Sequence, residues 1–262
     1  MSTDLEDRFE FTLVAHYNPL QDIETKSRET IELFEKWGMS SRMKSHTFFF
    51  NKFFQPYQRE AFAKDFFASS VVSSTLQVLT PLEQWVSLNN TSVDKVTVEQ
   101  VNASIINMDF FDRLYTSGAV RESSGSIVKC FDEMIDEFLV SDELRKVVLG
   151  DPVYESLYST EERNEFLFKI FAHIVLGGPV NQYEDNVKPY LDTAKLLYKS
   201  LVSVVKDTET SSLSISSTVL KVGAKVGGIK MFPSSREHPQ SFCYLVIDNI
   251  KRHVTVWYHI WS

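Results

Sequence analysis

The sequence has few cysteines, no long apolar run and no basic stretch. Its two cysteines, Cys130 and Cys243, form no Cys-x-x-Cys pair, whereas a small secreted protein usually holds more cysteines at regular spacings. No run approaches the ~18 consecutive apolar residues of a transmembrane helix. The formal net charge of −8 repels phosphate backbones and anionic lipid. We therefore expect neither nucleic-acid binding nor membrane insertion.

The composition is that of a folded protein. Of the 262 residues, 43% are apolar and 24% are charged, which allows a sizeable core and argues against wholesale disorder. Twenty residues are phenylalanine, and we expect most of these rings in the core or on a partner surface. Residues 1–7 are polar and acidic and resemble neither a signal peptide nor a transit peptide. We therefore expect a cytoplasmic protein with one domain spanning residues 1–262.

The apolar pattern mixes helices and strands without regular alternation. It contains no βαβ repeat, which disfavours a doubly wound parallel sheet. The sequence predicts an α+β fold with a mixed, largely antiparallel sheet, a central helical block and β-hairpins near the C-terminus. In the first part of the chain, helices are predicted at 23–37 and 57–67, and strands at 9–16, 47–50, 76–79, 85–88, 93–98 and 103–108.

The central helical block is predicted over residues 130–178. Its first part has apolar residues at i, i+3, i+4, i+7 and i+8, a spacing typical of one face of a helix. These residues are Phe131, Met134, Ile135, Phe138 and Leu139.

Capping residues divide the rest of this block. Ser141 is the expected N-cap of a helix over 142–149 that ends at the next glycine. Ser159 and Glu162 have the spacing of a capping box, and the longer helix that follows is expected to end at 177–179.

The last part of the chain returns to strands. A helix is predicted at 189–198, followed by one hairpin of strands 201–205 and 213–222. A second hairpin is predicted from strands 242–247 and 253–260.

Patterns that resemble catalytic or metal motifs are incomplete. The glycine-rich stretch 222–230 lacks the Gly-Lys-Ser/Thr end of a P-loop, so we expect turn glycines there. The sequence indicates no histidine partner that would make Cys130 a nucleophile. His253 and His259 would lie roughly 20 Å apart on one strand, too far to share a metal ion with contacts near ~2 Å. We expect no catalytic, cofactor-binding or metal-binding residues and no enzyme activity.

Adjacent carboxylates occur at 132–133, 136–137, 142–143 and 184–185. General acid–base catalysis needs two carboxylates that converge across a cleft with separated pKa values. Side-by-side acids more often form a solvated face, and they can equally form an acidic docking surface. The residues alone leave both interpretations open.

Several stretches resemble the cilia- and flagella-associated protein 300 family, in consistent order along about the whole chain. They are FFDRLY at 110–115, SGSIVKC at 124–130, FLVSDELRKVVL at 138–149, EFLFKIFAH at 165–173, LGG at 176–178, QYED at 182–185, PYLDTAKLLYKSLVSV at 189–204 and RHVTVWYH at 252–259. No single stretch is decisive, but their number makes the resemblance specific.

The resemblance implies a factor for assembly or delivery of outer and inner axonemal dynein arms. Its implied partners are axonemal dynein chains, dynein-arm preassembly co-chaperones of the kintoun type, and the intraflagellar transport machinery. The implied location is the cytoplasm and the motile cilium or flagellum. The family supplies no catalytic residues. The alternative is a structural component stably bound in the axoneme.

Two segments at the borders of the helical block combine polar and aromatic residues, and we expect them to bind the partner. They comprise Ser141, Asp142, Glu143, Arg145, Gln182, Tyr183, Glu184 and Asp185. The competing interpretation is that these residues are caps and turns that hold the helices together.

Overall fold

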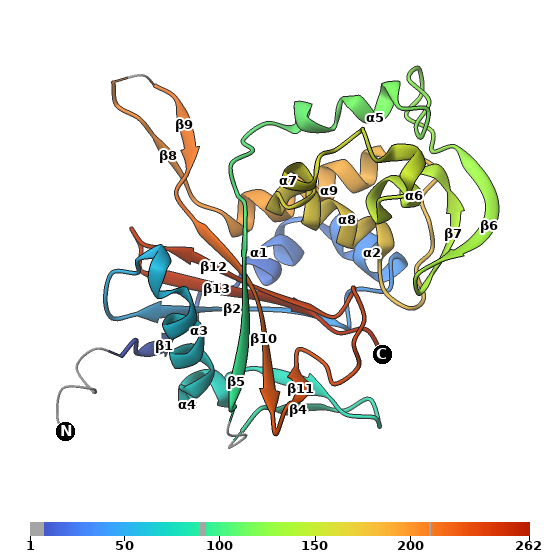
Figure 1. Cartoon of the computed structure of the whole chain (residues 1–262). Coiled ribbons are helices and arrows are strands. Elements are labelled where there is room, and N and C mark those ends of the chain that lie inside the picture. The colour runs from blue at the N-terminus through green and yellow to red at the C-terminus, as the bar shows by residue number, and fades with distance from the viewer. Residues whose placement is uncertain (1–7, 90–92, 210) are drawn as a thin grey trace.

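A computed structural model describes residues 8–89, 93–209 and 211–262 (Figure 1). Residues 1–7, whose composition argued against a signal peptide, lie outside the described residues. The main sheet has seven strands, and all of its pairings are antiparallel. In spatial order these are β1 (Phe11–Leu13), β2 (Met43–Phe50), β13 (His253–His259), β12 (Phe242–Asp248), β10 (Thr218–Val226) and β11 (Ile229–Phe232), with β5 (Lys95–Val101) on the other edge of β10. The predicted α+β class is confirmed.

Two predicted turns set the register of the C-terminal strands. The predicted hairpin of β12 and β13 is present, and it pairs Phe242 with His259 and Asp248 with His253. Strands β10 and β11 are joined by Gly227 and Gly228, whose φ values are 58° and 79°. Glycine adopts this left-handed conformation without strain. These residues of the glycine-rich stretch are therefore turn glycines.

Both faces of the main sheet are buried at its central strands. All seven residues of β12 are buried. Tyr244, Val246 and Trp257 face a core formed with one group of helices. Leu245 and Val254 face a second core on the opposite side. The last strand, β13, is likewise buried on both faces, because helices distant in sequence cover each side of the sheet.

The first face carries the larger helical layer (Figure 1). Its central helix, α8, has nine buried residues out of eleven and ends at Gly177, as predicted. The predicted capping box of Ser159 and Glu162 is present. The helix predicted at 23–37 is two helices, because Ser27 caps the end of one and the start of the next. The helices of this layer are α1 (Pro19–Lys26), α2 (Arg28–Lys36), α6 (Glu143–Leu149), α7 (Thr160–Arg163), α8 (Phe166–Leu176) and α9 (Lys188–Leu201).

The helix predicted across 131–139, the first part of the block at 130–178, is wrong. This segment forms a two-stranded antiparallel hairpin of β6 (Lys129–Ile135) and β7 (Phe138–Asp142). Asp136, with a φ of 52°, lies in its turn. Only alternate residues of β7, Phe138 and Val140, reach the core, which is the periodicity of a strand. The N-cap of α6 is consequently Asp142 and not Ser141.

Shorter elements complete the described chain. The strand predicted at 103–108 is absent, because residues 103–107 belong to no helix or strand. The hairpin predicted from strands 201–205 and 213–222 is wrong in its second strand: the strand Val204–Lys206 pairs with the short strand Leu213–Ile215 outside the main sheet, and residues 218–222 belong to β10 of the main sheet. These elements are α3 (Arg59–Ala68), α4 (Ser70–Thr75), α5 (Arg113–Thr116), β3 (Gln77–Leu79), β4 (Trp85–Ser87), β8 (Val204–Lys206), β9 (Leu213–Ile215), η1 (Pro56–Gln58), η2 (Met108–Phe111) and η3 (Pro152–Tyr154).

The second core is built largely from phenylalanine. Phe62, on α3, is fully buried. Its ring centroid lies 4.8 Å from that of Phe9, 5.2 Å from Phe11, 5.4 Å from Phe50 and 5.1 Å from Phe54, all in edge-to-face geometry. Such aromatic pairs stabilise a core beyond the area that they bury. Phe62 therefore joins α3 to the first strands of the sheet.

A hydrogen-bonded network of histidine, glutamine and tyrosine lies buried beside the larger core. His173 Nδ1 donates to Gln240 Oε1 at 2.6 Å, so its Nε2 accepts from the Tyr244 hydroxyl at 2.8 Å. His259 Nδ1 donates to the Gln240 carbonyl at 2.6 Å. Burial lowers the pKa of His259 to about 4 and holds the pKa of His173 well below its ordinary value. Both imidazoles are therefore neutral structural groups at neutral pH.

Replacing Phe62 by alanine removes the ring around which the second core packs. We expect Phe62→Ala to lower the free energy of unfolding by about 3–5 kcal/mol, measured by urea denaturation. Tyr57→Ala is the control, because Tyr57 is 82% exposed and its loss should change stability by less than about 0.5 kcal/mol. Equal effects of the two substitutions would contradict this description of the core.

The buried histidines predict a loss of stability in mild acid. An unfolded histidine has a pKa of about 6.5. Below that pH the unfolded chain is protonated at His173 and His259, whereas in the folded protein burial keeps both side chains neutral. Stability is full above this pKa and falls as the pH drops from there towards the pKa of about 4 of His259.

The measurement is the free energy of urea unfolding at several pH values from 7 down to about 5.5. Each buried histidine should contribute a slope approaching about 1.4 kcal/mol per pH unit. His259→Asn keeps an amide donor near the position of Nδ1 but cannot titrate, so it should reduce this slope. A variant with the wild-type slope would show that His259 is not the source.

Candidate functional site

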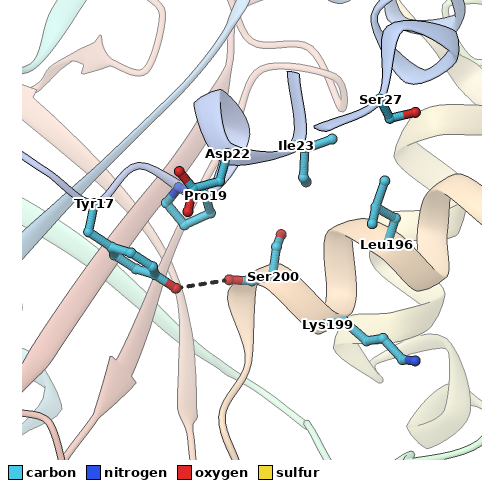
Figure 2. A pocket seen from close by; sticks show the side chains of 8 residues that line it. All are labelled: Tyr17, Pro19, Asp22, Ile23, Ser27, Leu196, Lys199 and Ser200. Atoms are coloured by element: carbon cyan, nitrogen blue, oxygen red, sulfur yellow. Dashed lines mark hydrogen bonds between the residues drawn. The ribbon is translucent and has the colours of Figure 1, made fainter. Parts of the chain in front are cut away.

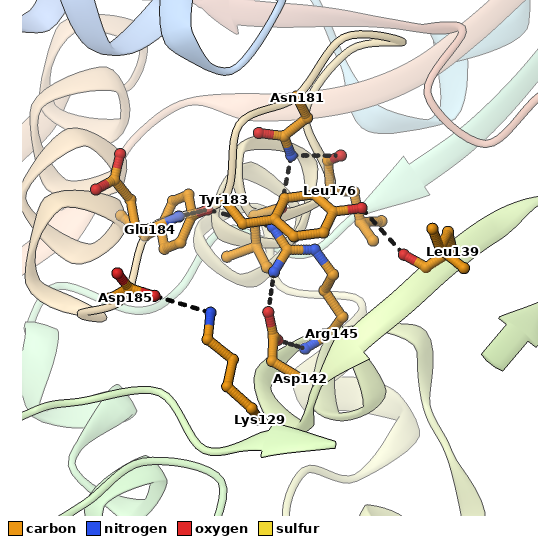
Figure 3. A network of polar contacts seen from close by, with 11 residues as sticks. Lys129, Leu139, Asp142, Arg145, Leu176, Asn181, Tyr183, Glu184 and Asp185 are labelled. Atoms are coloured by element: carbon orange, nitrogen blue, oxygen red, sulfur yellow. Dashed lines mark hydrogen bonds and ion pairs between the residues drawn. The ribbon is translucent and has the colours of Figure 1, made fainter. Parts of the chain in front are cut away.

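The fold brings together the two segments that the sequence predicts to bind a partner (Figure 3). Residues 141–145 span the end of β7 and the start of α6, and residues 182–185 lie between α8 and α9. The Tyr183 ring lies over Arg145, whose guanidinium carbon is 3.2 Å from the ring centroid. The Tyr183 hydroxyl donates to the Leu139 carbonyl at 3.0 Å. We call Asp142, Arg145, Tyr183, Glu184 and Tyr190 the Arg145 cluster.

Arg145 is the buried centre of this cluster, with 1% of its surface exposed. It forms an ion pair with Asp142, whose other carboxylate oxygen accepts from the Arg145 backbone N–H at 3.0 Å. Its Nη2 donates to the Val175 carbonyl at 2.9 Å and to the Tyr190 hydroxyl at 3.3 Å. A buried ion pair is tolerated when further hydrogen bonds satisfy its polar groups. Arg145 thus connects β7 and α6 to the last turn of α8 and to α9.

Glu184 connects the same region to α2. Its carboxylate accepts from Trp37 Nε1 at 3.0 Å and from Lys36 Nζ at 2.8 Å, and only 9% of the residue is exposed. Its backbone N–H donates to the Tyr190 hydroxyl at 3.1 Å. Burial raises the pKa of Tyr190, which keeps this hydroxyl protonated. Asp142, Arg145 and Glu184 therefore hold elements together.

The other predicted residues lie nearer the surface. Gln182 and Asp185 are exposed, and Ser141 is half-buried. The Asp185 carboxylate, 93% exposed, lies 2.9 Å from Lys129 Nζ, and this hydrogen bond lowers the pKa of Asp185. Half-buried Glu143 accepts from the Tyr154 hydroxyl at 2.9 Å. Of the predicted set, Gln182 and Asp185 are the exposed members.

The structure exposes three large apolar side chains that the sequence predicted on the apolar face of a helix. Phe131 is 97% exposed, Met134 64% and Leu139 49%. Met134 and Leu139 are directly paired across the hairpin. Between β6 and α6 lies a cavity of about 660 Å³ that is lined by Lys129, Cys130, Phe131, Glu133, Glu143 and Lys146. In the sequence, the only indication of these exposed side chains was the large number of apolar residues in this segment.

A second cavity, of about 560 Å³, lies between α1 and α9 (Figure 2). The Tyr17 hydroxyl donates to the Ser200 carbonyl at 3.5 Å across it. Its charged residues, Asp22 and Lys199, do not converge, because Lys199 points away from Asp22. The remaining lining residues are Pro19, Ile23, Ser27 and Leu196. This arrangement offers no nucleophile paired with a base.

The described residues contain no group of three metal-ligating side chains. Within the same part of the chain, no helix combines the length and the apolar character needed to cross a membrane. Burial raises the pKa of Cys130 and raises that of Cys243 well above its ordinary value. Reactive cysteines have depressed pKa values, so neither thiol has the character of a nucleophile.

Comparisons with known proteins agree on one family. The family model described as cilia- and flagella-associated protein 300 matches residues 8–259. A protein of that name from Chlamydomonas reinhardtii is 34% identical over 245 residues, covering 92% of both chains. Another, from Paramecium tetraurelia, is 29% identical over 239 residues, covering 89% of this chain and 90% of its own. No solved structure matches the chain.

Charge reversal should lower stability at a buried member of the predicted site but not at an exposed one. Glu184→Lys places a cation beside Lys36 in a buried position, and we expect it to lower the free energy of unfolding by about 3–5 kcal/mol. Asp185→Lys, the matched change at the next residue, should leave the melting temperature nearly unchanged, because the side chain is 93% exposed. Calorimetry on both variants tests this, and equal melting temperatures would contradict the structural role of Glu184.

Proposed function

The chain belongs to the cilia- and flagella-associated protein 300 family, and from this premise we propose that it is a non-enzymatic factor that assembles or delivers axonemal dynein arms. It serves outer and inner arms by binding other proteins. Its partners are axonemal dynein chains, preassembly co-chaperones of the kintoun type, and the intraflagellar transport machinery. It works in the cytoplasm and in the motile cilium or flagellum.

The observation that supports binding is the exposed apolar surface of the β6–β7 hairpin. The hairpin leaves Phe131, Met134 and Leu139 exposed, and exposed large apolar side chains mark many protein–protein interaction sites. The hairpin is fixed to the body by Phe138 and Val140 in the core and by the bond from Tyr183 to the Leu139 carbonyl. A surface held in one conformation loses less entropy when a partner binds.

The polar chemistry of the described residues supports the same proposal. The buried charges of the Arg145 cluster are paired or hydrogen-bonded within the fold. The buried histidines His173 and His259 are likewise bonded to Gln240. These buried groups hold the elements of the fold together. The exposed carboxylate of Asp185 and the Lys129 ammonium that it pairs with are instead accessible to another protein.

The first test is a pull-down of the tagged chain from ciliated-cell cytoplasm, read by mass spectrometry at low and at high salt. We expect recovery of dynein heavy chains or their preassembly co-chaperones, with less recovery at high salt because exposed charges contribute. Asp185→Lys should reduce recovery without changing the melting temperature, and the tag alone is the control.

Two results would overturn the proposal. Recovery of only tubulin and axonemal structural proteins would assign the chain to the finished axoneme instead. Recovery of nothing beyond the tag control would contradict function by protein binding.

A further inference from the structure

Phe131 is an exception among the phenylalanines of this chain. Of the twenty phenylalanines, Phe53 and Phe131 are the ones with highly exposed side chains, at 59% and 97%. Phe131 therefore gains almost nothing from the fold, since the stabilisation of an apolar side chain depends on the area removed from water. It lies on the same hairpin as exposed Met134 and Leu139. The hairpin thus presents apolar area that a partner can bury.

The charge of the hairpin is mostly negative, since its one lysine, Lys129, lies at the start of β6 and is paired with Asp185. Residues 130–139 contain four carboxylates and no lysine, arginine or histidine. Glu133 lies 2.7 Å from Lys146, and Glu137 lies 3.4 Å from Arg236. Asp132 and Asp136 are exposed, and neither has a cation within ion-pair distance among the described residues. An approaching cation would meet free carboxylates beside the apolar side chains.

The hairpin also lies in an accessible place. Strand β6 is at the outer rim of the molecule (Figure 1) and, in the described chain, pairs only with β7. Every residue of β6 is exposed or half-buried. The inner face of β7 is occupied by Phe138 and Val140 in the core. A partner can therefore reach the edge of β6 and the outer face of the hairpin without displacing any part of the fold.

We propose that hairpin 129–142 docks a segment of a partner protein that combines lysine or arginine with apolar side chains. This deepens the proposed function, on which it rests, by giving the chemistry of the partner. The apolar side chains cover Phe131 and Met134, and the cations pair with Asp132 and Asp136. Nucleic acid and anionic lipid do not fit, because the hairpin repels them. A second copy would place the same carboxylates against one another if it paired hairpin to hairpin.

The test uses the full-length protein and two short labelled peptides, one alternating lysine with valine and the other alternating glutamate with valine. Fluorescence anisotropy measures both affinities. We expect the lysine peptide to bind and the glutamate peptide, with the same apolar content, to bind at least about tenfold more weakly. Equal binding of the two peptides, or binding of neither, would overturn the proposal.

Variants locate the binding. Phe131→Ser should weaken the lysine peptide about tenfold or more, as expected for an aromatic anchor. Phe53→Ser is the matched control, because it makes the same change at an exposed phenylalanine elsewhere in the chain, between β2 and η1. Melting temperatures of both variants establish that they are folded. Wild-type affinity of folded Phe131→Ser would overturn the proposal.

A double variant tests the role of charge. Asp132→Asn with Asp136→Asn keeps the side-chain shapes, and asparagine tolerates the positive φ of residue 136. It should weaken the lysine peptide several-fold and reduce the salt dependence of binding. Glu60→Gln with Glu209→Gln removes the same number of exposed carboxylates elsewhere. If both double variants lose affinity equally, the net charge of the chain and not the hairpin attracts the peptide, and the proposal is wrong.

The peptide and the pull-down can fail separately. The peptide measurements contain no ciliary protein, so the predicted affinities together with a pull-down free of dyneins would sustain the docking chemistry and overturn the proposed function. Equal recovery of dynein chains by wild type and by Phe131→Ser would sustain the proposed function and overturn docking at the hairpin.

Discussion

The burial of β12 at all seven positions is the constraint on which the rest of the architecture depends. A strand without a solvated face requires cover on both sides of its sheet. One side is closed by the layer around α8, and the other by α3 with its phenylalanine cluster around Phe62. Since the faces of the central strands are occupied, the surfaces available to other proteins include the outer sides of the helices, the edge strands and the hairpins at the rim.

Within the helical layer, the buried charge of Arg145 sets the position of one such hairpin. Its partners come from β7, α8 and α9, and each contact satisfies a donor that would otherwise be costly to bury. Tyr183 covers the guanidinium and bonds to the Leu139 carbonyl of the hairpin. The buried members of the predicted partner-binding segments therefore hold the hairpin on the body, while Asp185 and Gln182 remain exposed.

Several predictions that depend on local contacts are confirmed. The Ser159 capping box, the end of α8 at Gly177 and the β12–β13 hairpin depend on residues a few positions apart, and all are present. The burial of Arg145 could not be predicted, because its partners Val175 and Tyr190 lie 30 and 45 residues away. For the same reason the sequence located segments 141–145 and 182–185 but could not tell their buried from their exposed members.

The wrong helix at 131–139 has a different origin. The periodicity argument assumes that apolar side chains are placed to be buried by their own chain, and here Phe131, Met134 and Leu139 are not. Phe138 and Val140 have the two-residue spacing of a strand. The exposed apolar residues between and around them produce a pattern that resembles the apolar face of a helix. Local rules fail most often where a sequence serves something besides its own fold. Phe131, Met134 and Leu139, the exposed members of this apparent stripe, are not explained by the packing of this chain, and they fit the proposed contact with a partner.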